Sequence, residues 1–441
     1  MSLQTRPKNT VETGKRRFLN RMIAVLIGGM LLDGYILGIV GPVSSAMADE
    51  LQLSPLWEGL IVAAALLGIL AGSPLGGWAA DKWGRKPLFT FDIALFTVAS
   101  AMQFFIDSPV LLLVARLLMG IAIGIEYSVG WPLMGEFSPT RLRGRLLGAM
   151  NIAWYGGFMM AYLIGYLLNE YTEIGWRFIL GTSTFLALLL FIARLGMPES
   201  PRWLFSVGRR DEARLLAQKY LPDDALSDLE HEDVRKGSFA MLFSRQYWRS
   251  TLFISGFWFC AVAPYFAIAT FADSVLHQYG LAGGLAGGVG LSAVALAGVV
   301  ITFFLIDKLG RRVLTVPTQW LCAVVLAVIG IWGGAPPAVV LVLFLVFSFF
   351  NAGYTTLTGV YPAEIFPTEI RGIGTGFATS ISRIGAFVGT FLMPLAIENL
   401  GTSTTMLIAA AVAFAGAGLS QWLAPETKGM SLTEAAAGYT H

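Results

Sequence analysis

Long apolar stretches separated by short polar segments occur twelve times along the chain. Each holds about 20 or more mainly apolar residues, the length an α-helix needs to cross the hydrocarbon core of a bilayer. Because that core offers no partners for backbone N–H and C=O groups, such segments form helices. We predict membrane-spanning helices at residues 18–47, 57–80, 86–106, 109–137, 145–169, 176–196, 248–273, 286–307, 312–333, 338–362, 372–397 and 403–424.

The composition supports this pattern. Of the 441 residues, 56% are hydrophobic and 13% are charged. In soluble domains, about half of the residues are apolar and about a quarter are charged. The net charge of +2 gives no reason to expect nucleic acid as a partner. We therefore expect an all-α membrane protein whose main surroundings are the lipid bilayer.

Three polar motifs occur twice. The second copy of each follows the first by 226 to 228 residues, which is too long for a solenoid repeat and indicates a duplicated half-molecule. The motifs include Asp81 to Lys86 with Asp307 to Arg312, Glu136 to Thr140 with Glu364 to Thr368, and Pro198 to Ser200 with Pro425 to Thr427. The sequence therefore predicts two pseudo-symmetric halves of six helices each.

Lysine and arginine residues fall almost entirely in alternate loops, so the positive-inside rule places both termini in the cytoplasm. The long polar segment between the halves contains a predicted amphipathic helix at 209–220. We expect five parts: a cytoplasmic N-terminus (1–17), an N-terminal half (18–197), a cytoplasmic linker (198–247), a C-terminal half (248–424) and a cytoplasmic tail (425–441).

These motifs resemble those of the major facilitator superfamily over essentially the whole chain. The stretch from Gly77 to Lys86 is similar to the signature of its loop between spans 2 and 3, and residues 307–312 are similar to the copy between spans 8 and 9. Residues 198–204 and 425–429 are similar to the branch of sugar porters and organic-ion transporters. The resemblance implies a monomeric transporter of the bacterial inner membrane that carries a small molecule, coupled to protons, by alternating access and without a cofactor.

Span 7 departs from the sugar-porter pattern. It reads Trp258 to Ala269 without the glutamine-rich motif that binds hexoses. Asp33-Gly34-Tyr35 in span 1 is similar to the acidic motif of aromatic-acid/proton symporters. We therefore expect inward symport of a small organic acid or sugar-acid-like metabolite. Proton-driven efflux, and proton-independent facilitation of sugars or organic cations, stay open as alternatives.

Three ionisable residues fall near the middle of predicted spans, where each needs a partner or a function. Asp33 is either a proton carrier or part of a fixed ion pair, and Glu126 is either a proton carrier or a protonated packing residue. Arg383 offers a planar fork that suits a carboxylate, so it binds an anionic substrate group or else neutralises one of these two acids.

The resemblance adds further site residues. In sugar porters the arginine of span 4 pairs with the acid of span 1, which implies that Arg116 pairs with Asp33 and joins the proton-coupling residues. Spans 1, 4, 7 and 10 line the cavity in this superfamily. The aromatic residues that this selects for substrate binding are Tyr35, Tyr127, Trp258, Tyr265 and Tyr354.

The repeated polar motifs are candidates for gating as well as for orientation. We expect Asp81 to meet the positive N-terminal end of a facing helix and Arg85 to meet an acid such as Glu136 or Asp92, with Asp92 supporting this arginine. The complete predicted gating set is Gly77, Asp81, Arg85, Glu136, Asp307, Arg311 and Glu364.

Nothing in the sequence favours an enzyme. The three histidines, His231, His277 and His441, lie outside the predicted spans, and no metal-binding cluster or Gly-x-Ser-x-Gly motif occurs. We therefore expect no catalytic residue and no metal. A non-transporting sensor would need a larger soluble module than this chain carries.

Overall fold

All regular structure in the described part of the chain is helical. The computed structural model describes residues 8–139, 142–221, 238–281 and 284–430, and no strand occurs among them. Within these described ranges, twelve helical segments are long and apolar enough to cross a membrane. This finding confirms the predicted all-α class and the predicted number of spans.

The helices form two sets of six spans. The first set consists of α1 (Lys8–Gly38), α3 (Pro55–Trp83), α4 (Arg85–Met102), α5 (Pro109–Phe137), α6 (Arg143–Tyr171) and the pair α7 (Trp176–Gly181) and α8 (Ser183–Arg194). The second set consists of α12 (Trp248–Thr270), α14 (Gly284–Leu309), α15 (Arg311–Ile331), α16 (Pro337–Thr355), α18 (Thr368–Leu400) and α19 (Thr402–Leu423).

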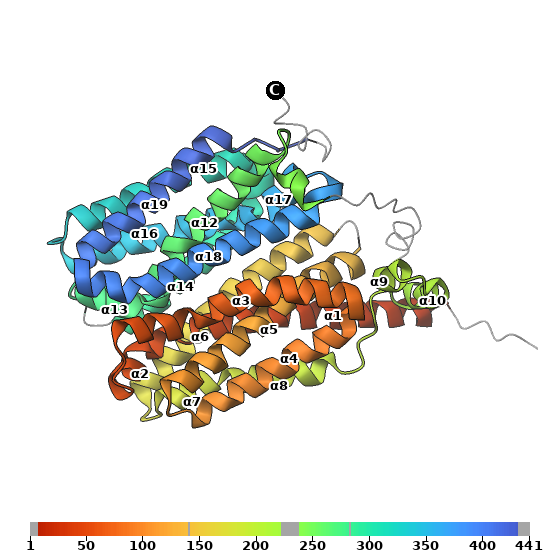
Figure 1. The fold of residues 1–441 in the computed structure, drawn as a ribbon, viewed down its shortest axis with the longest axis horizontal. Coiled ribbons are helices and arrows are strands. Elements are labelled where there is room, and N and C mark those ends of the chain that lie inside the picture. Colours follow the sequence, from red (N-terminus) through yellow and green to blue (C-terminus); the bar gives the residue numbers. More distant parts are fainter. Residues whose placement is uncertain (1–7, 140–141, 222–237, 282–283, 431–441) are drawn as a thin grey trace, which may run out of the picture.

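Shorter helices lie at the ends of the spans. The helices α2 (Ser44–Glu50) and α13 (Ala272–Gln278) lie with α7 at one end of the bundle, here called the α2/α13 end. The helices α9 (Pro201–Ser206), α10 (Arg210–Tyr220) and α17 (Val360–Ile365) lie at the opposite end, called the α9/α10 end (Figure 1). The predicted linker helix corresponds to α10.

The main helix contacts lie within each half, and fewer helix pairs meet between the halves. In the first half α3 lies along α5 and α1 along α6, and in the second α12 lies along α18 and α15 along α19. Between the halves, α3 contacts α18 and α6 contacts α14. Figure 1 shows the helices of the first half, in warm colours, below the green and blue helices of the second. Any central site therefore lies between two six-helix units.

The contact between α1 and α6 depends on glycine. A Cβ atom built on Gly34 would lie 1.9 Å from the carbonyl oxygen of Trp154, and one built on Gly157 would lie 1.9 Å from that of Leu31. The two backbones touch reciprocally, as small residues allow in membrane helices. This close approach fixes the position of α1 against the aromatic residues of α6.

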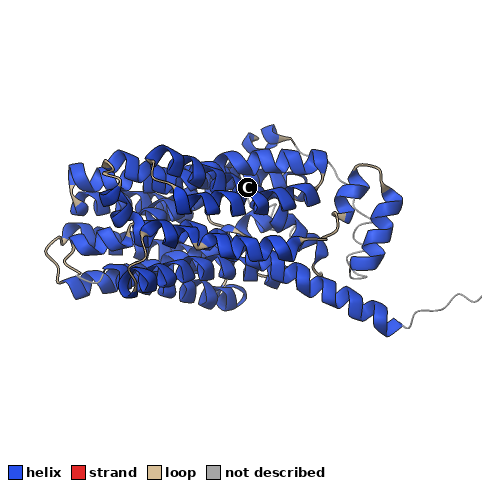
Figure 2. Ribbon diagram, turned by 90° about the horizontal axis from the view of Figure 1, so that it is seen from below, coloured by secondary structure: helices blue, strands red, loops and turns tan. Residues whose placement is uncertain are grey.

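The N-terminal part of α1 extends beyond the bundle (Figure 2). Its Phe18 ring lies 4.2 Å from the ring of Tyr220 in α10, centroid to centroid. The linker helix is thus held against the first span by an aromatic contact.

We predict that Gly157→Ala destabilises the protein by about 1–3 kcal/mol, the usual cost of forcing extra atoms into a packed interior. The neighbouring Gly156 is the matched control, because a Cβ atom there meets nothing within 4 Å. Thermal unfolding of the purified variants in detergent is the measurement. Equal melting temperatures for the two alanine variants would show that the α1–α6 contact is not as tight as described.

Candidate functional site

Among the residues that the structure describes, six charged side chains are buried within the spans, in addition to Glu136 near the α9/α10 end. None of the six is more than 8% exposed. They comprise three acids and three arginines: Asp33, Asp92, Glu126, Arg116, Arg194 and Arg383. Since a charge in the interior of a membrane protein is costly, each of these groups needs a partner or a function.

Arg194, at the end of α8, holds two of the acids. Its Nη2 lies 2.6 Å from Oε2 of Glu126 and its Nη1 lies 3.0 Å from Oδ1 of Asp92. Its Nη1 also donates to the carbonyl oxygen of Phe89 at 3.0 Å, and its Cζ lies 3.8 Å from the centroid of the Phe89 ring. These contacts satisfy both terminal nitrogens of the buried guanidinium, as a stable buried ion pair requires, whereas its Nε has no hydrogen-bond partner within the described structure.

This arrangement corrects the sequence analysis in two ways. Asp92 does not support the arginine of the loop between spans 2 and 3, because it pairs with Arg194. No role was predicted for Arg194, because it lies in the last turn of a span, where arginine commonly marks the cytoplasmic border. Only the packing of α4, α5 and α8 brings these three residues together.

Asp33 is the acid without a partner. Both of its carboxylate oxygens are buried and accept no hydrogen bond within the described structure. The charged groups near enough to act on it are Glu126, Arg194, Asp92 and Arg383. Of the alternatives from the sequence, a fixed ion pair therefore does not hold in this conformation.

Arg116 does not form the pair that the family resemblance implied. Its Nη2 donates only a long hydrogen bond, 3.5 Å, to the carbonyl oxygen of Ile36, and its Nε and Nη1 have no partner within the described structure. The bonded carbonyl lies about one turn along α1 from Asp33. The predicted Asp33–Arg116 contact is wrong for this conformation, because Arg116 lies one turn too far along the helices.

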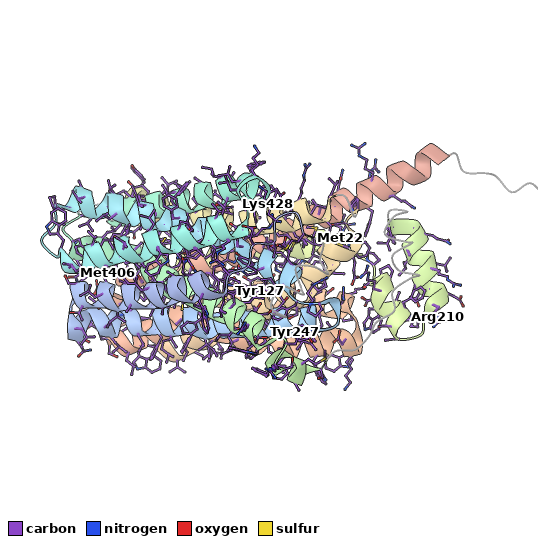
Figure 3. All side chains as sticks on the ribbon, turned by 90° about the horizontal axis from the view of Figure 1, so that it is seen from above. Met22, Tyr127, Arg210, Tyr247, Met406 and Lys428 are labelled. Carbon is purple, nitrogen blue, oxygen red and sulfur yellow. The ribbon has the colours of Figure 1, made fainter. Side chains whose placement is uncertain are left out.

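Arg383 faces the first half from α18. Its Cζ lies 5.4 Å from the centroid of the Tyr127 ring, a cation–π contact between the halves. The Nε atom is buried and has no hydrogen-bond partner within the described structure. Glu126 is held by Arg194, so the alternative that Arg383 neutralises Glu126 is not supported. Figure 3 places Tyr127 between Met406, near the α2/α13 end, and Arg210, beyond the other end.

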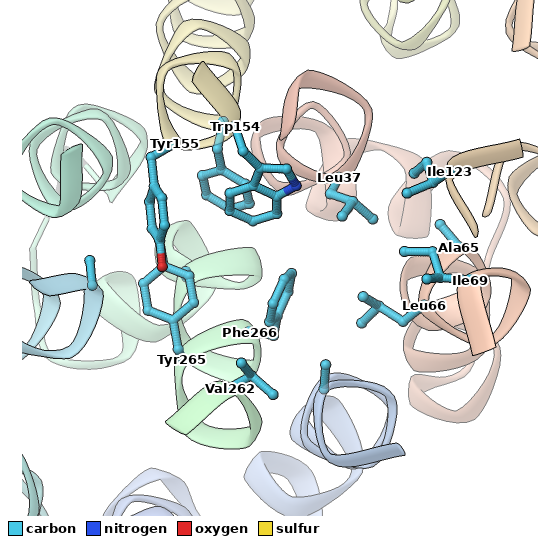
Figure 4. Packing of buried hydrophobic residues seen from close by; sticks show 14 of the residues in the cluster. Leu37, Ala65, Leu66, Ile69, Ile123, Trp154, Tyr155, Val262, Tyr265 and Phe266 are labelled. Atoms are coloured by element: carbon cyan, nitrogen blue, oxygen red, sulfur yellow. The ribbon is translucent and has the colours of Figure 1, made fainter. Parts of the chain in front are cut away.

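The aromatic residues around this point come from both halves. The hydroxyl of Tyr127 accepts a hydrogen bond from Nε1 of Trp154 at 3.0 Å. The ring of Trp154 lies 5.9 Å from that of Phe266, and the ring of Tyr155 lies 6.0 Å from that of Tyr265. Figure 4 shows Trp154, Tyr155, Tyr265 and Phe266 directed toward one another. The predicted residues Tyr127 and Tyr265 thus belong to one aromatic cluster.

The structure places the other predicted aromatic residues differently. The hydroxyl of Tyr35 bonds to Oγ1 of Thr182 at 2.7 Å, on span 6, and the hydroxyl of Tyr354 accepts from Nδ2 of Asn351 at 2.7 Å. Trp258 is partly buried on α12. Trp154 and Tyr155 lie on span 5, outside the spans that the family resemblance selected. An aromatic pair in the middle of that span was the only signal for them.

Hydrogen bonds also join the halves. The hydroxyls of Tyr155 and Thr355 lie 2.8 Å apart. Nearer the α2/α13 end, the hydroxyl of Tyr162 donates to the carbonyl oxygens of Ala269 and Thr270, the latter at 3.0 Å. These carbonyls lie where α12 ends, so Tyr162 satisfies backbone groups that the helix leaves free.

The repeated motifs form the same structure at the α9/α10 end of each half. In the first half Arg85 pairs with Glu136, and Glu199 accepts from the backbone N–H groups of Arg85 and Lys86 at 2.9 and 3.1 Å. The hydroxyl of Ser200 donates to Glu136 at 2.6 Å. Glu199 therefore occupies the positive N-terminal end of α4.

The second half repeats these contacts. Arg311 pairs with Glu364 at 2.8 Å, the hydroxyl of Thr427 donates to Glu364, and Glu426 accepts from the backbone N–H groups of Arg311 and Arg312 at 2.9 and 3.0 Å. Oδ1 of Asp307, near the end of α14, lies 3.2 Å from Nη1 of Arg311, the first residue of α15. The repeated motifs therefore form their contacts within their own half.

Two glycines make room for the capping acids. Gly84 and Gly310 have φ angles of +100° and +97°, and a Cβ atom built on them would lie 2.4 and 2.5 Å from carboxylate oxygens of Glu199 and Glu426. Both the backbone angle and the close contact require glycine here.

The structure corrects the prediction for Asp81. Its side chain is exposed, and the acid at a helix N-terminus is Glu199. A Cβ atom built on Gly77 would lie 3.9 Å from Oγ of Ser128, an ordinary van der Waals contact, so the packing does not require glycine there. Of the acids proposed for Arg85, Glu136 is confirmed as the partner and Asp92 is not.

The electrostatics of the capping site are clearest at Glu426, which follows the last span. Partial burial raises the pKa of this carboxyl, but the backbone N–H groups of Arg311, Lys428 and Arg312 lower the pKa by more. The resulting pKa lies below the usual 4.5. Glu426 is therefore more stable as a carboxylate in the folded protein than in the unfolded chain.

Comparisons with known proteins agree with this architecture. A family model described as "Sugar (and other) transporter" matches residues 22–439. The inner membrane metabolite transport protein YgcS of Escherichia coli is 37% identical over 98% of this chain and 97% of its own length. The putative metabolite transport protein YaaU of the same organism is 37% identical over 92% of each chain.

Among solved structures, the proton:xylose symporter XylE of the major facilitator superfamily, bound to 6-bromo-6-deoxy-D-glucose, superposes with a TM-score of 0.75 at 20% identity. The match covers 96% of this chain and 100% of that one. At this level of identity, the likeness bears on the fold alone.

We predict that Arg194→Gln lowers the free energy of unfolding by about 3–5 kcal/mol, because two buried carboxylates lose their counter-ion. Adding Asp92→Asn and Glu126→Gln to this variant removes the uncompensated charges and restores most of the stability. Thermal unfolding in detergent measures both effects. A single Arg194→Gln variant as stable as the original protein would contradict the buried ion pair.

We predict that Glu426→Gln lowers stability at pH 7, and that the difference from the original protein shrinks as the pH falls below about 4.5. A depressed folded-state pKa stabilises above the unfolded pKa, and the stabilisation is lost as the pH falls through the folded pKa. Melting temperatures at pH 7, 5 and 4 are the measurement. The exposed Glu398 is the control, and its replacement by Gln should change stability by no more than about 0.5 kcal/mol. A Glu426→Gln deficit that is the same at all three pH values would exclude this origin.

Proposed function

This chain belongs to the sugar transporter family of the major facilitator superfamily, and on that premise we propose that it is a proton-coupled symporter of a small organic acid. Its relatives are membrane transporters, so the protein is a multi-pass membrane transporter and not an enzyme. The proposed substrates are carboxylates, including sugar-acid-like metabolites, taken up through the bacterial inner membrane with both termini cytoplasmic. A single chain forms the transport unit.

The observation that carries the proposal is a pair of unpaired, opposite charges on the two halves. Asp33 in α1 accepts no hydrogen bond, and Arg383 in α18 has a free Nε beside Tyr127. The remaining acids near them are held by Arg194. A free acid suits a proton and a free guanidinium suits a carboxylate, so each half contributes one group to binding.

The aromatic cluster supports the substrate side of the proposal. Arg383 lies against Tyr127, and Tyr127 is linked to Trp154 by a hydrogen bond. A carboxylate bonded to Arg383 would place the rest of a small flat molecule beside these rings. Polyhydroxylated acids fit as well, because the hydroxyls of Tyr155 and Thr355 lie close by as a bonded pair.

Alternating access follows from the two-unit architecture. The two halves rock about the central site, so that Asp33 and Arg383 face one side of the membrane at a time. The contact of Tyr162 with Ala269 and Thr270 closes the α2/α13 end and has to break when that end opens. The capping motifs at the α9/α10 end keep each half rigid during the movement.

A neutral sugar is the second candidate substrate. XylE, with which this chain shares its fold, is described as a proton:xylose symporter, and Asp33 would serve a sugar symporter equally well. The buried Arg383 and the absence of a glutamine-rich motif from span 7 favour an acid instead. Proton-driven efflux and proton-independent facilitation differ from both in their response to a proton gradient.

We predict proton-dependent uptake of carboxylates into proteoliposomes. A suitable panel is gluconate, galacturonate, lactate and 3,4-dihydroxybenzoate, with xylose and a quaternary ammonium compound, each with and without an inward proton gradient. Arg383→Gln should reduce carboxylate uptake at least tenfold, since a charged hydrogen bond contributes about 1.5–3 kcal/mol. Asp33→Asn should abolish accumulation driven by protons.

Matched controls are Arg214→Gln and Asp211→Asn, two exposed residues of α10, which should leave uptake unchanged. Xylose uptake that exceeds carboxylate uptake and survives Arg383→Gln would favour the sugar alternative. Uptake of any compound that ignores the proton gradient would favour the facilitator.

A further inference from the structure

We infer that each carboxylate crosses the membrane together with one proton, so that transport is electroneutral, because Arg383 balances Asp33 in the empty carrier and the substrate in the loaded one. This inference rests on the proposed function and adds its stoichiometry. It also predicts which component of the proton-motive force drives uptake.

The first step is the balance of buried charges. The three acids and three arginines buried in the spans sum to zero when all are ionised. Two acids share Arg194, and the remaining charges are those of Asp33, Arg116 and Arg383. The empty carrier thus reorients without a net buried charge, which is the condition that a low-dielectric interior favours.

The second step is the effect of a bound carboxylate. When the substrate bonds to Arg383, it adds one negative charge beside Asp33 and occupies the arginine that balanced it. The buried sum becomes −1 unless one acid binds a proton. A loaded carrier without this proton would be on the order of 100-fold rarer during reorientation, judged from the insertion cost of one charge.

The third step identifies the acid that binds the proton. Glu126 and Asp92 are bonded to Arg194 at 2.6 and 3.0 Å, and protonation would sacrifice these ion pairs. Asp33 has both oxygens free of hydrogen bonds. The groups that act on Asp33 from the packed helices are Glu126, Arg194, Asp92 and Arg383, and Arg383 is the one whose charge the substrate cancels.

The position of Tyr127 connects the two binding events. Its ring lies 5.4 Å from the guanidinium carbon of Arg383, and both Arg383 and Asp33 act electrostatically on its hydroxyl. Tyr127 therefore lies near both the proton site and the anion site. A charge bound at one site therefore changes the free energy of binding at the other site, and this coupling requires no movement of the backbone.

The test uses proteoliposomes with the four carboxylates of the panel, where the pH gradient and the membrane potential are set independently. Potassium gradients with valinomycin set the potential, and protein-free liposomes correct for leakage. A gradient of one pH unit should sustain about tenfold accumulation, and a potential of 100 mV, negative inside, should change the accumulation less than twofold.

A second measurement counts protons directly. Addition of the transported carboxylate to the purified protein in weakly buffered detergent solution should take up one proton per bound molecule, as read by a pH indicator. The Asp33→Asn variant should bind the same carboxylate with no proton uptake and with an affinity that does not vary with pH. Asp211→Asn is the control and should retain an uptake of one proton.

The outcomes separate this inference from the proposed function. Proton-dependent carboxylate uptake that rises severalfold with the potential, or a count near two protons, overturns the 1:1 stoichiometry and leaves the symport intact. A count near zero in the original protein overturns proton coupling itself. Failure of every carboxylate in the panel to show proton-dependent uptake overturns the proposed function and this inference together.

Discussion

The buried ion pair of Arg194 with Glu126 and Asp92 is the interaction on which the central site depends. Charges inside a membrane protein persist only when they are paired or functional, and this arginine satisfies two acids at once. Asp33 is consequently left as the acid that is free to bind a proton. A Cβ atom built on Gly29 of α1 would lie 2.3 Å from Oε1 of Glu126. The first span therefore needs glycine at this position to leave room for the ion pair.

A second constraint acts at the α9/α10 end. Glu199 and Glu426 cap the helices that begin at Arg85 and Arg311, and each cap requires a glycine with positive φ. The contacts are the same in both halves because a helix N-terminus has the same free N–H groups wherever it occurs. These caps hold each half as a unit, while the halves meet mainly where α3 lies against α18 and α6 lies against α14. That division suits a protein that works by moving one half against the other.

The amino-acid sequence predicts the fold class, the number of spans and the duplication without any knowledge of the packing. Apolar stretches of fixed length and alternate basic loops are local features, and a bilayer admits few structures that satisfy them. It also identifies Asp33, Glu126 and Arg383 as candidate site residues, because an ionisable residue in the middle of an apolar span is rare and needs a partner or a function. The pairing of Arg85 with Glu136 and of Arg311 with Glu364 was accessible from the repeated motifs.

Which charges meet depends on how the helices pack. The family resemblance implied that Asp33 pairs with Arg116, and Asp92 was expected to support a loop arginine, whereas the packing of α4, α5 and α8 brings Asp92 and Glu126 to Arg194. The structure also shows that the capping acid is Glu199 and not Asp81. Trp154 and Tyr155 of span 5 belong to the aromatic cluster as well. The physical reason is that partner choice depends on the rotation and offset of neighbouring helices. The packing of small residues sets both, and a shift of one helical turn exchanges one partner for another.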